Sequence, residues 1–93
     1  MDVKVGLYRI AQEALNNIVK HAHATEVVLA LTGGAEQVHL TIQDNGRGFD
    51  LAQLPPERLG IPIMHERADS IEASLTIDTE LQQGTTVAVQ WPK

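Results

Sequence analysis

Asp44-Asn45-Gly46-Arg47-Gly48-Phe49 is the segment of this 93-residue chain that best indicates how it folds and what it binds. Apolar and polar residues alternate before it, from Val38 to Ile42, which predicts a strand ending at the acidic residue. Asp-Asn-Gly is also common in plain hairpin turns, but no second strand follows at hairpin distance. A carboxylate there can accept a hydrogen bond from the exocyclic amine of adenine, and glycines let the backbone approach a purine closely. We therefore expect a purine site at this strand end.

A helix is predicted upstream, from about Lys4 to Ala22. Glu13 and Asn17 are four residues apart and share one face, at the border of the apolar stripe. They are either solvated polar residues or a site for Mg²⁺, which prefers oxygen ligands. Lys20 and His21 continue this flank, where cations can approach phosphates or stabilise the helix C-terminus. The apolar stripe itself has helical spacing and consists of Leu7, Ile10, Ala11, Ala14, Leu15, Ile18 and Ala22.

Alternating apolar residues predict four short strands, at about 27–31, 38–42, 75–77 and 87–91. Gly33-Gly34 and segment 80–84 are the expected hairpin turns. One-sided alternation predicts a sheet with one covered and one solvated face, so both helices should pack on the same side. The predicted fold is a two-layer α/β (α+β) sandwich.

The stretch from Asp44 to Leu59 has no sustained period, and loops of about this length are usually functional. A second helix is predicted from about Ile61 to Ile71, with Pro62 in its first turn. Gly60 leads into its N-terminus, whose free N–H groups and positive dipole end favour phosphate oxygens. We expect residues 49–59 to form a lid that is poorly ordered without a ligand.

Composition excludes several classes of protein. The net charge of −5 argues against nucleic-acid binding, and the absence of cysteine excludes disulfides and thiolate metal sites. No apolar run approaches the roughly 20 residues that span a bilayer, and the N-terminus lacks a signal-peptide pattern. The histidines show no metal-binding spacing, and no complete Gly-x-x-x-x-Gly-Lys-Ser/Thr loop is present. We expect one domain, residues 1–93, in the cytoplasm.

Taken in order, these segments resemble the catalytic ATP-binding domain of sensor histidine kinases. This domain has the Bergerat-type fold, shared with type II topoisomerases, mismatch-repair ATPases and a heat-shock chaperone family. The likeness is strongest to the nitrate-sensor-like subfamily and spans roughly residues 7–92. Segment 9–22 resembles the subfamily's asparagine motif, 44–49 its first glycine motif, 60–68 the start of its second helix, and 84–87 its last motif.

The resemblance implies a mixed or antiparallel sheet, with helices on one face and a flexible lid over ATP. It implies that Glu13 is the catalytic residue and that Asn17 is the ligand of Mg²⁺. Asp44 would hold the adenine amine, and Glu13 would assist the metal-bound water or position the phosphates. Arg67 is a weaker candidate on the phosphate side. The implied nucleotide-binding residues are Asn17, Lys20, His21, Asp44, Gly46, Gly48, Gly60 and Thr85.

By the same resemblance, the chain would bind Mg-ATP and supply the γ-phosphoryl group for autophosphorylation of a histidine. That histidine would lie on a separate dimerisation domain of the parent protein, a membrane-bound sensor of a two-component system that signals to a response regulator. None of this chain's histidines has a phosphoacceptor context, so we expect the fragment alone to bind ATP with little turnover. The alternatives are an anti-sigma-type serine kinase of the same fold and a non-catalytic nucleotide-binding or interaction domain.

The chain also departs from the subfamily pattern. Arg58 stands where an aromatic residue or histidine is usual, and a glycine pair is reduced to Gly60. Glu72-Ala73 replaces paired glycines after the second helix. A left-handed C-cap would carry a Cβ penalty of roughly 1 kcal/mol there, so we expect a differently shaped helix end. The strand that the family often places before the first helix is not seen in this sequence.

Overall fold

The computed structural model describes residues 2–50 and 55–93, and its elements follow the predicted order. Helix α1 (Val3–Asn17) begins after Asp2, whose carboxylate accepts hydrogen bonds from two N–H groups of the first turn at 2.9 and 3.4 Å. Such an N-cap stabilises a helix start. The helix continues as a π-helical turn (Ile18–Ala22) and ends at His23, which is left-handed. The predicted helix at 4–22 is confirmed, with a wider last turn than an α-helix has.

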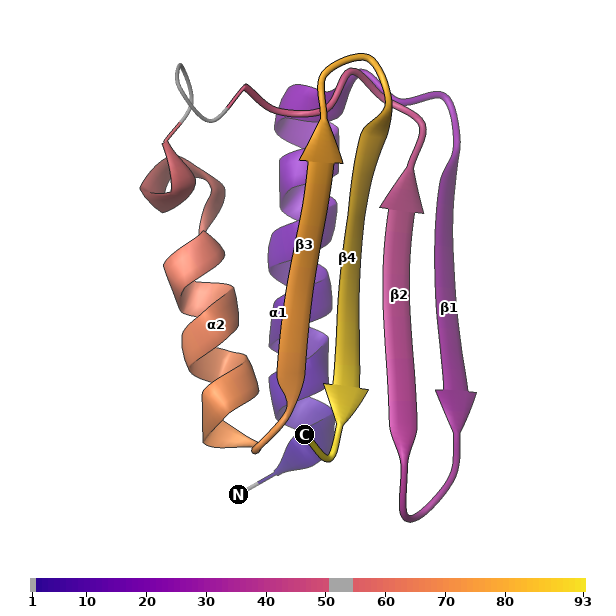
Figure 1. Ribbon diagram of the computed structural model, residues 1–93, viewed down its shortest axis with the longest axis vertical. Coiled ribbons are helices and arrows are strands. Elements are labelled where there is room, and N and C mark those ends of the chain that lie inside the picture. Colours follow the sequence, from indigo (N-terminus) through magenta and orange to yellow (C-terminus); the bar gives the residue numbers. More distant parts are fainter. Residues whose placement is uncertain (1, 51–54) are drawn as a thin grey trace.

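The sheet has four antiparallel strands in the order β1-β2-β4-β3 (Figure 1). The strands are β1 (Val27–Gly33), β2 (Val38–Asp44), β3 (Ser74–Glu80) and β4 (Gly84–Trp91). The two hairpins meet where β2 pairs with β4, in a register that places Asp44 opposite Thr85. The acidic residue of the glycine segment therefore lies beside the start of the last strand.

Both helices pack on one face of the sheet, which confirms the two-layer sandwich (Figure 1). Helix α2 (Ile61–Ser70) follows a single 3₁₀ turn (Pro56–Leu59). None of the helices in the described part of the chain is long and apolar enough to cross a membrane. The buried core between the layers consists of Ile10, Ala14, Leu40, Ile42, Met64, Ala68, Ile71, Ala73, Val87 and Val89.

The edge strand β1 is exposed along its whole length, unlike the half-covered strand that was predicted. Leu31 pairs with Leu40, so the two side chains share one face of the sheet. Nevertheless Leu31 is 63% exposed and Leu40 only 4%. In Figure 1, α1 passes behind β3, and no helix of the described residues lies over β1. Alternation predicted the strand correctly, but burial depends on what covers it.

The C-terminus of α2 forms a Schellman motif. The N–H of Ala73 donates to the carbonyl of Ala68 at 2.9 Å, and the N–H of Glu72 donates to the carbonyl of Asp69 at 3.1 Å. Glu72 has a φ of 59°, the left-handed position that glycine usually occupies in this motif. The prediction of a differently shaped helix end is therefore wrong, because Glu72 adopts the left-handed conformation despite its Cβ.

The predicted lid at 49–59 is described only in part. Residues 51–54 lie outside the described residues, so the expected lack of order without a ligand stays a prediction. The end of the segment is the 3₁₀ turn, which leads into Gly60, the N-cap residue of α2. Pro62 lies in the first turn of α2, as predicted.

Candidate functional site

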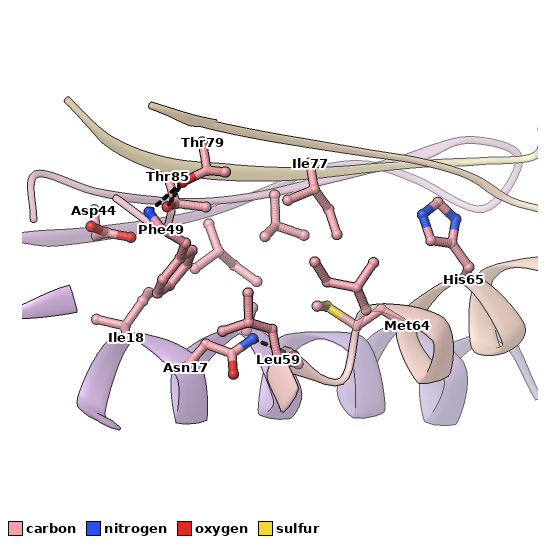
Figure 2. Close-up of a pocket in the computed structure, with 14 residues that line it drawn as sticks. Asn17, Ile18, Asp44, Phe49, Leu59, Met64, His65, Ile77, Thr79 and Thr85 are labelled. Atoms are coloured by element: carbon pink, nitrogen blue, oxygen red, sulfur yellow. Dashed lines mark hydrogen bonds between the residues drawn. The ribbon is translucent and has the colours of Figure 1, made fainter. Parts of the chain in front are cut away.

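A cavity of about 220 Å³ lies between α1, the start of α2 and the inner face of β2, β4 and β3 (Figure 2). Most of its wall is apolar, with side chains such as Ile42, Met64, Ile77 and Val87. The polar side chains on its wall include Asn17, Asp44, Thr79 and Thr85. A largely apolar cleft with a few convergent polar groups is typical of a small-molecule site.

Asp44 supplies an unused hydrogen-bond acceptor to this cavity. Its side chain is 3% exposed, and its Oδ1 accepts a hydrogen bond of 2.8 Å from the N–H of Gly46. Its Oδ2 is buried and has no hydrogen-bond partner within residues 2–50 and 55–93. Buried polar atoms in native proteins are rarely left without a partner, and leaving one unpaired costs free energy. The arrangement favours a ligand that donates a hydrogen bond to Oδ2.

The backbone around Asp44 allows no side chain on β4 at the adjacent position. A Cβ on Gly84 would lie 2.1 Å from the carbonyl oxygen of Asp44, and Gly84 has a φ of 91°. Both facts require glycine, because a Cβ would clash and strain the backbone. Gly84 thus lets β4 start beside Asp44, with Thr85 at the cavity wall.

Two threonines line the cavity next to Asp44. The N–H of Phe49 donates to Thr79 Oγ1 at 2.9 Å, and Thr79 Oγ1 lies 2.9 Å from Thr85 Oγ1 (Figure 2). The first contact anchors the chain where it leaves the glycine segment. Phe49 is buried, and its ring meets that of His21 edge-on with 6.3 Å between centroids.

On the helix side of the cavity, Asn17 is hydrogen-bonded to Leu59, the last residue of the 3₁₀ turn. Its Nδ2 donates a buried hydrogen bond of 2.6 Å to the carbonyl oxygen of Leu59. Glu13 approaches the next residue, because a Cβ on Gly60 would lie 2.5 Å from Glu13 Oε2. The predicted pair Glu13 and Asn17 therefore lies against the hinge between the 3₁₀ turn and α2.

The glycine segment itself is held at both sides. Asn45 Oδ1 accepts hydrogen bonds of 3.0 Å from the N–H groups of Thr25 and Glu26. Arg47 donates from its backbone N–H to the carbonyl of Ala22 at 2.8 Å, and its own carbonyl accepts from Gln82 at 2.7 Å. The segment is therefore held between the π-helical turn and the β3–β4 turn.

The predicted site residues fall into three groups. Asn17, Asp44 and Thr85 line the cavity together. Glu13 and Gly60 are neighbours at its hinge. The remaining residues lie outside the cavity wall. Lys20 is exposed, Gly46 is buried and donates its N–H to Asp44, and His21 and Gly48 line a second hollow next to Phe49.

Thr79 is a cavity residue that was not predicted. Its strand was expected to end near Ile77, and a threonine in a strand gives no signal of its own. The hairpin register could have located it, because Thr79 pairs with Thr85 across β3 and β4. Leu59 was also missed, because its contribution is a backbone carbonyl, which any residue could supply.

This chain belongs to the family of histidine kinase-, DNA gyrase B- and HSP90-like ATPases, which matches it over residues 2–93. It is 36% identical over 92 residues to the signal transduction histidine-protein kinase/phosphatase DegS of Bacillus subtilis. It is 38% identical over 85 residues to the nitrate/nitrite sensor protein NarX of Escherichia coli. These alignments cover 96% and 91% of this chain but only 24% and 14% of DegS and NarX.

Solved structures show the same fold. The histidine kinase domain of a blue-light activated histidine kinase from Erythrobacter litoralis superposes with a TM-score of 0.77 at 24% identity, covering 94% of this chain and 43% of that one. The ATP-binding domain of PrrB from Mycobacterium tuberculosis superposes with a TM-score of 0.69 at 28% identity, covering 90% and 64%. An open antiparallel sheet with helices on one side is thus the fold of histidine kinase ATPase domains.

Proposed function

We propose that this chain is the ATP-binding domain of a two-component sensor histidine kinase and that it binds Mg-ATP in the cavity beside Asp44. The observation that carries the proposal is the buried, unpartnered Oδ2 of Asp44 in an otherwise largely apolar cavity. The exocyclic amine of adenine donates a hydrogen bond, whereas guanine presents a carbonyl oxygen at the equivalent position. The purine would lie between the sheet and α1, against apolar side chains such as Ile42 and Val87.

The phosphates would extend towards the hinge at Gly60. The N-terminus of α2 begins there without a side-chain cap, so the first N–H groups and the positive end of the helix dipole are available to anions. Glu13 lies beside this hinge and is our candidate for positioning the phosphates or a metal-bound water. The roles of Lys20, His21, Gly46 and Gly48 in nucleotide binding remain part of the proposal.

The residues at the hinge fit Mg²⁺ with one protein ligand. Asn17 uses its amide nitrogen to bind Leu59, and its amide oxygen accepts no hydrogen bond from the described residues. Mg²⁺ in nucleotide sites takes one or two protein oxygens and completes its shell with phosphates and water. When bound, the ion would neutralise charge on the transferring phosphoryl group. Asn17 would hold it, with its orientation set by the Leu59 carbonyl.

Phosphoryl transfer requires a second domain. DegS is named a signal transduction kinase and phosphatase, and NarX is named a nitrate/nitrite sensor protein. The chain covers 24% or less of each. We propose that the parent protein carries the phosphoacceptor histidine on a dimerisation domain, signals to a response regulator, and holds this domain on the cytoplasmic side of a membrane. Catalysis by this domain would consist of positioning and charge neutralisation.

Labelling with γ-³²P-ATP tests this assignment. The full-length parent should incorporate acid-labile phosphate on a histidine outside these 93 residues, and the 93-residue chain alone should remain unlabelled. Acid-stable label on serine of a partner protein would instead identify the serine-kinase alternative. A chain that binds no adenine nucleotide in calorimetry would be the non-catalytic alternative.

A further inference from the structure

Three side chains form a row across the cavity end of the sheet. Asp44 on β2 pairs with Thr85 on β4, and Thr85 pairs with Thr79 on β3. Residues paired across strands share a face of the sheet, and all three line the cavity. The family resemblance implied nucleotide contacts for Asp44 and Thr85 but none for Thr79.

The hydrogen bonds of this row allow an order in which each hydroxyl group donates to the next partner. The N–H of Phe49 can only donate, so Thr79 Oγ1 is an acceptor in that contact. The proton of Thr79 is then available for Thr85 Oγ1, 2.9 Å away. When Thr85 accepts this proton, its own proton must point elsewhere. It is not used by Asp44 Oδ2, which has no partner in the described part of the chain.

We propose that Thr79 is a positioning residue for adenine specificity, acting through Thr85. In this role Thr79 accepts from the N–H of Phe49 and donates to Thr85 Oγ1, which leaves Thr85 to donate into the cavity, next to the acceptor Oδ2 of Asp44. Adenine presents the matching pair, an acceptor at N1 beside a donor at N6. Guanine presents the opposite pair, a donor at N1 and an acceptor at O6, so it would leave both groups unsatisfied. The inference rests on the proposed nucleotide site and adds a residue to it.

The test compares ADP with 1-deaza-ADP, in which CH replaces N1, by calorimetry on the 93-residue chain with Mg²⁺. Thr79→Val keeps the side-chain shape and removes the hydroxyl, whereas Thr79→Ser keeps the hydroxyl. We expect Thr79→Val to weaken ADP about threefold to tenfold, the range for one neutral hydrogen bond. Thr79→Val should change the affinity for 1-deaza-ADP by less than about twofold, because this ligand has no N1 to accept a hydrogen bond. Thr79→Ser should restore ADP binding to near the wild-type value.

A purely structural role of Thr79, through its bond to Phe49, would weaken both ligands equally, and that result would overturn the inference. Unchanged ADP affinity in Thr79→Val would also overturn it. A second test combines Thr79→Val with Thr85→Val. The double variant should lose no more ADP affinity than Thr85→Val alone. Additive losses of affinity would contradict action through Thr85. If the wild-type chain binds no ADP, the proposed function fails and the inference with it. If the wild-type chain binds ADP and Thr79→Val weakens ADP and 1-deaza-ADP equally, only the proposed role of Thr79 is wrong.

Discussion

Asn17 Nδ2 lies 2.6 Å from the carbonyl oxygen of Leu59, which ties the last residue of α1 to the residue just before Gly60. A carbonyl only accepts hydrogen bonds, so the contact determines which way the amide faces. The amide oxygen is left for another partner. One residue thereby links the hinge of the proposed lid to the proposed metal site.

Substitutions of Asn17 should separate these two roles. Asn17→Ala removes both the donor and the oxygen, so it should lower the free energy of unfolding by about 1–3 kcal/mol and reduce the Mg²⁺-dependent part of ATP binding. Asn17→Asp keeps an oxygen ligand but sets a carboxylate against the Leu59 carbonyl. It should lose stability while retaining more Mg²⁺ dependence than Asn17→Ala. Titrations of ATP with and without Mg²⁺ check this, and identical metal dependence in wild type and Asn17→Ala would exclude Asn17 as a ligand.

Asp44→Asn should reverse the preference between purines. The N–H of Gly46 requires an acceptor at the position of Oδ1, so the new amide must present its NH₂ group to the cavity. That group would face the adenine amine, donor against donor, and would suit a 6-oxo purine instead. We expect ADP affinity to fall about tenfold to a hundredfold, since a hydrogen bond to a charged group contributes roughly 1.5–3 kcal/mol. Affinity for inosine diphosphate should fall less or rise. An unchanged ratio of the two affinities would remove Asp44 from base recognition.

Glu72→Gly should stabilise the chain by about 1 kcal/mol. Glu72 occupies the left-handed position of the Schellman motif at φ 59°, where a Cβ is unfavourable. Glu72→Ala is the matched control, since alanine also has a Cβ and should gain little. Urea unfolding of the three proteins measures the difference. A glycine variant no more stable than the alanine variant would show that the left-handed residue carries no strain.

Leu31 and Leu40 should respond very differently to truncation, although they are direct partners on one face of the sheet. Leu40→Ala removes a core side chain and should cost about 2–5 kcal/mol. Leu31→Ala changes an exposed side chain and should stay within about 0.5 kcal/mol. Equal costs in urea unfolding would mean that β1 is covered in solution.

The local elements were predictable because each rests on spacing within one segment. Helical offsets predicted α1 and α2, and alternation predicted all four strands. The exposure of β1 was not predictable in this way, because it depends on where α1 crosses the sheet. The Schellman end at Glu72 was misjudged because a residue preference of about 1 kcal/mol is readily overridden by tertiary context.

The site was predictable where a side chain acts through its own chemistry. Asn17, Asp44 and Thr85 come from three segments, and the fold brings all three to one cavity. Lys20 was expected on the same flank as Asn17; it lies in the π-helical turn with its side chain exposed, and its role stays a prediction. Thr79 required the long-range register between β3 and β4, and Leu59 acts through its backbone.

The central claim is that an adenine nucleotide binds in the cavity between α1 and the inner face of the sheet. A ¹H–¹⁵N correlation spectrum of the 93-residue chain, titrated with Mg²⁺ and a non-hydrolysable ATP analogue, tests it most directly. The account predicts the largest shifts at the amides of Gly46 and Thr85 and at the side-chain amide of Asn17. Small shifts are expected for His39 and Gln43 on the solvated face of the sheet. Saturable shifts confined to that solvated face, or none at millimolar nucleotide, would contradict the account.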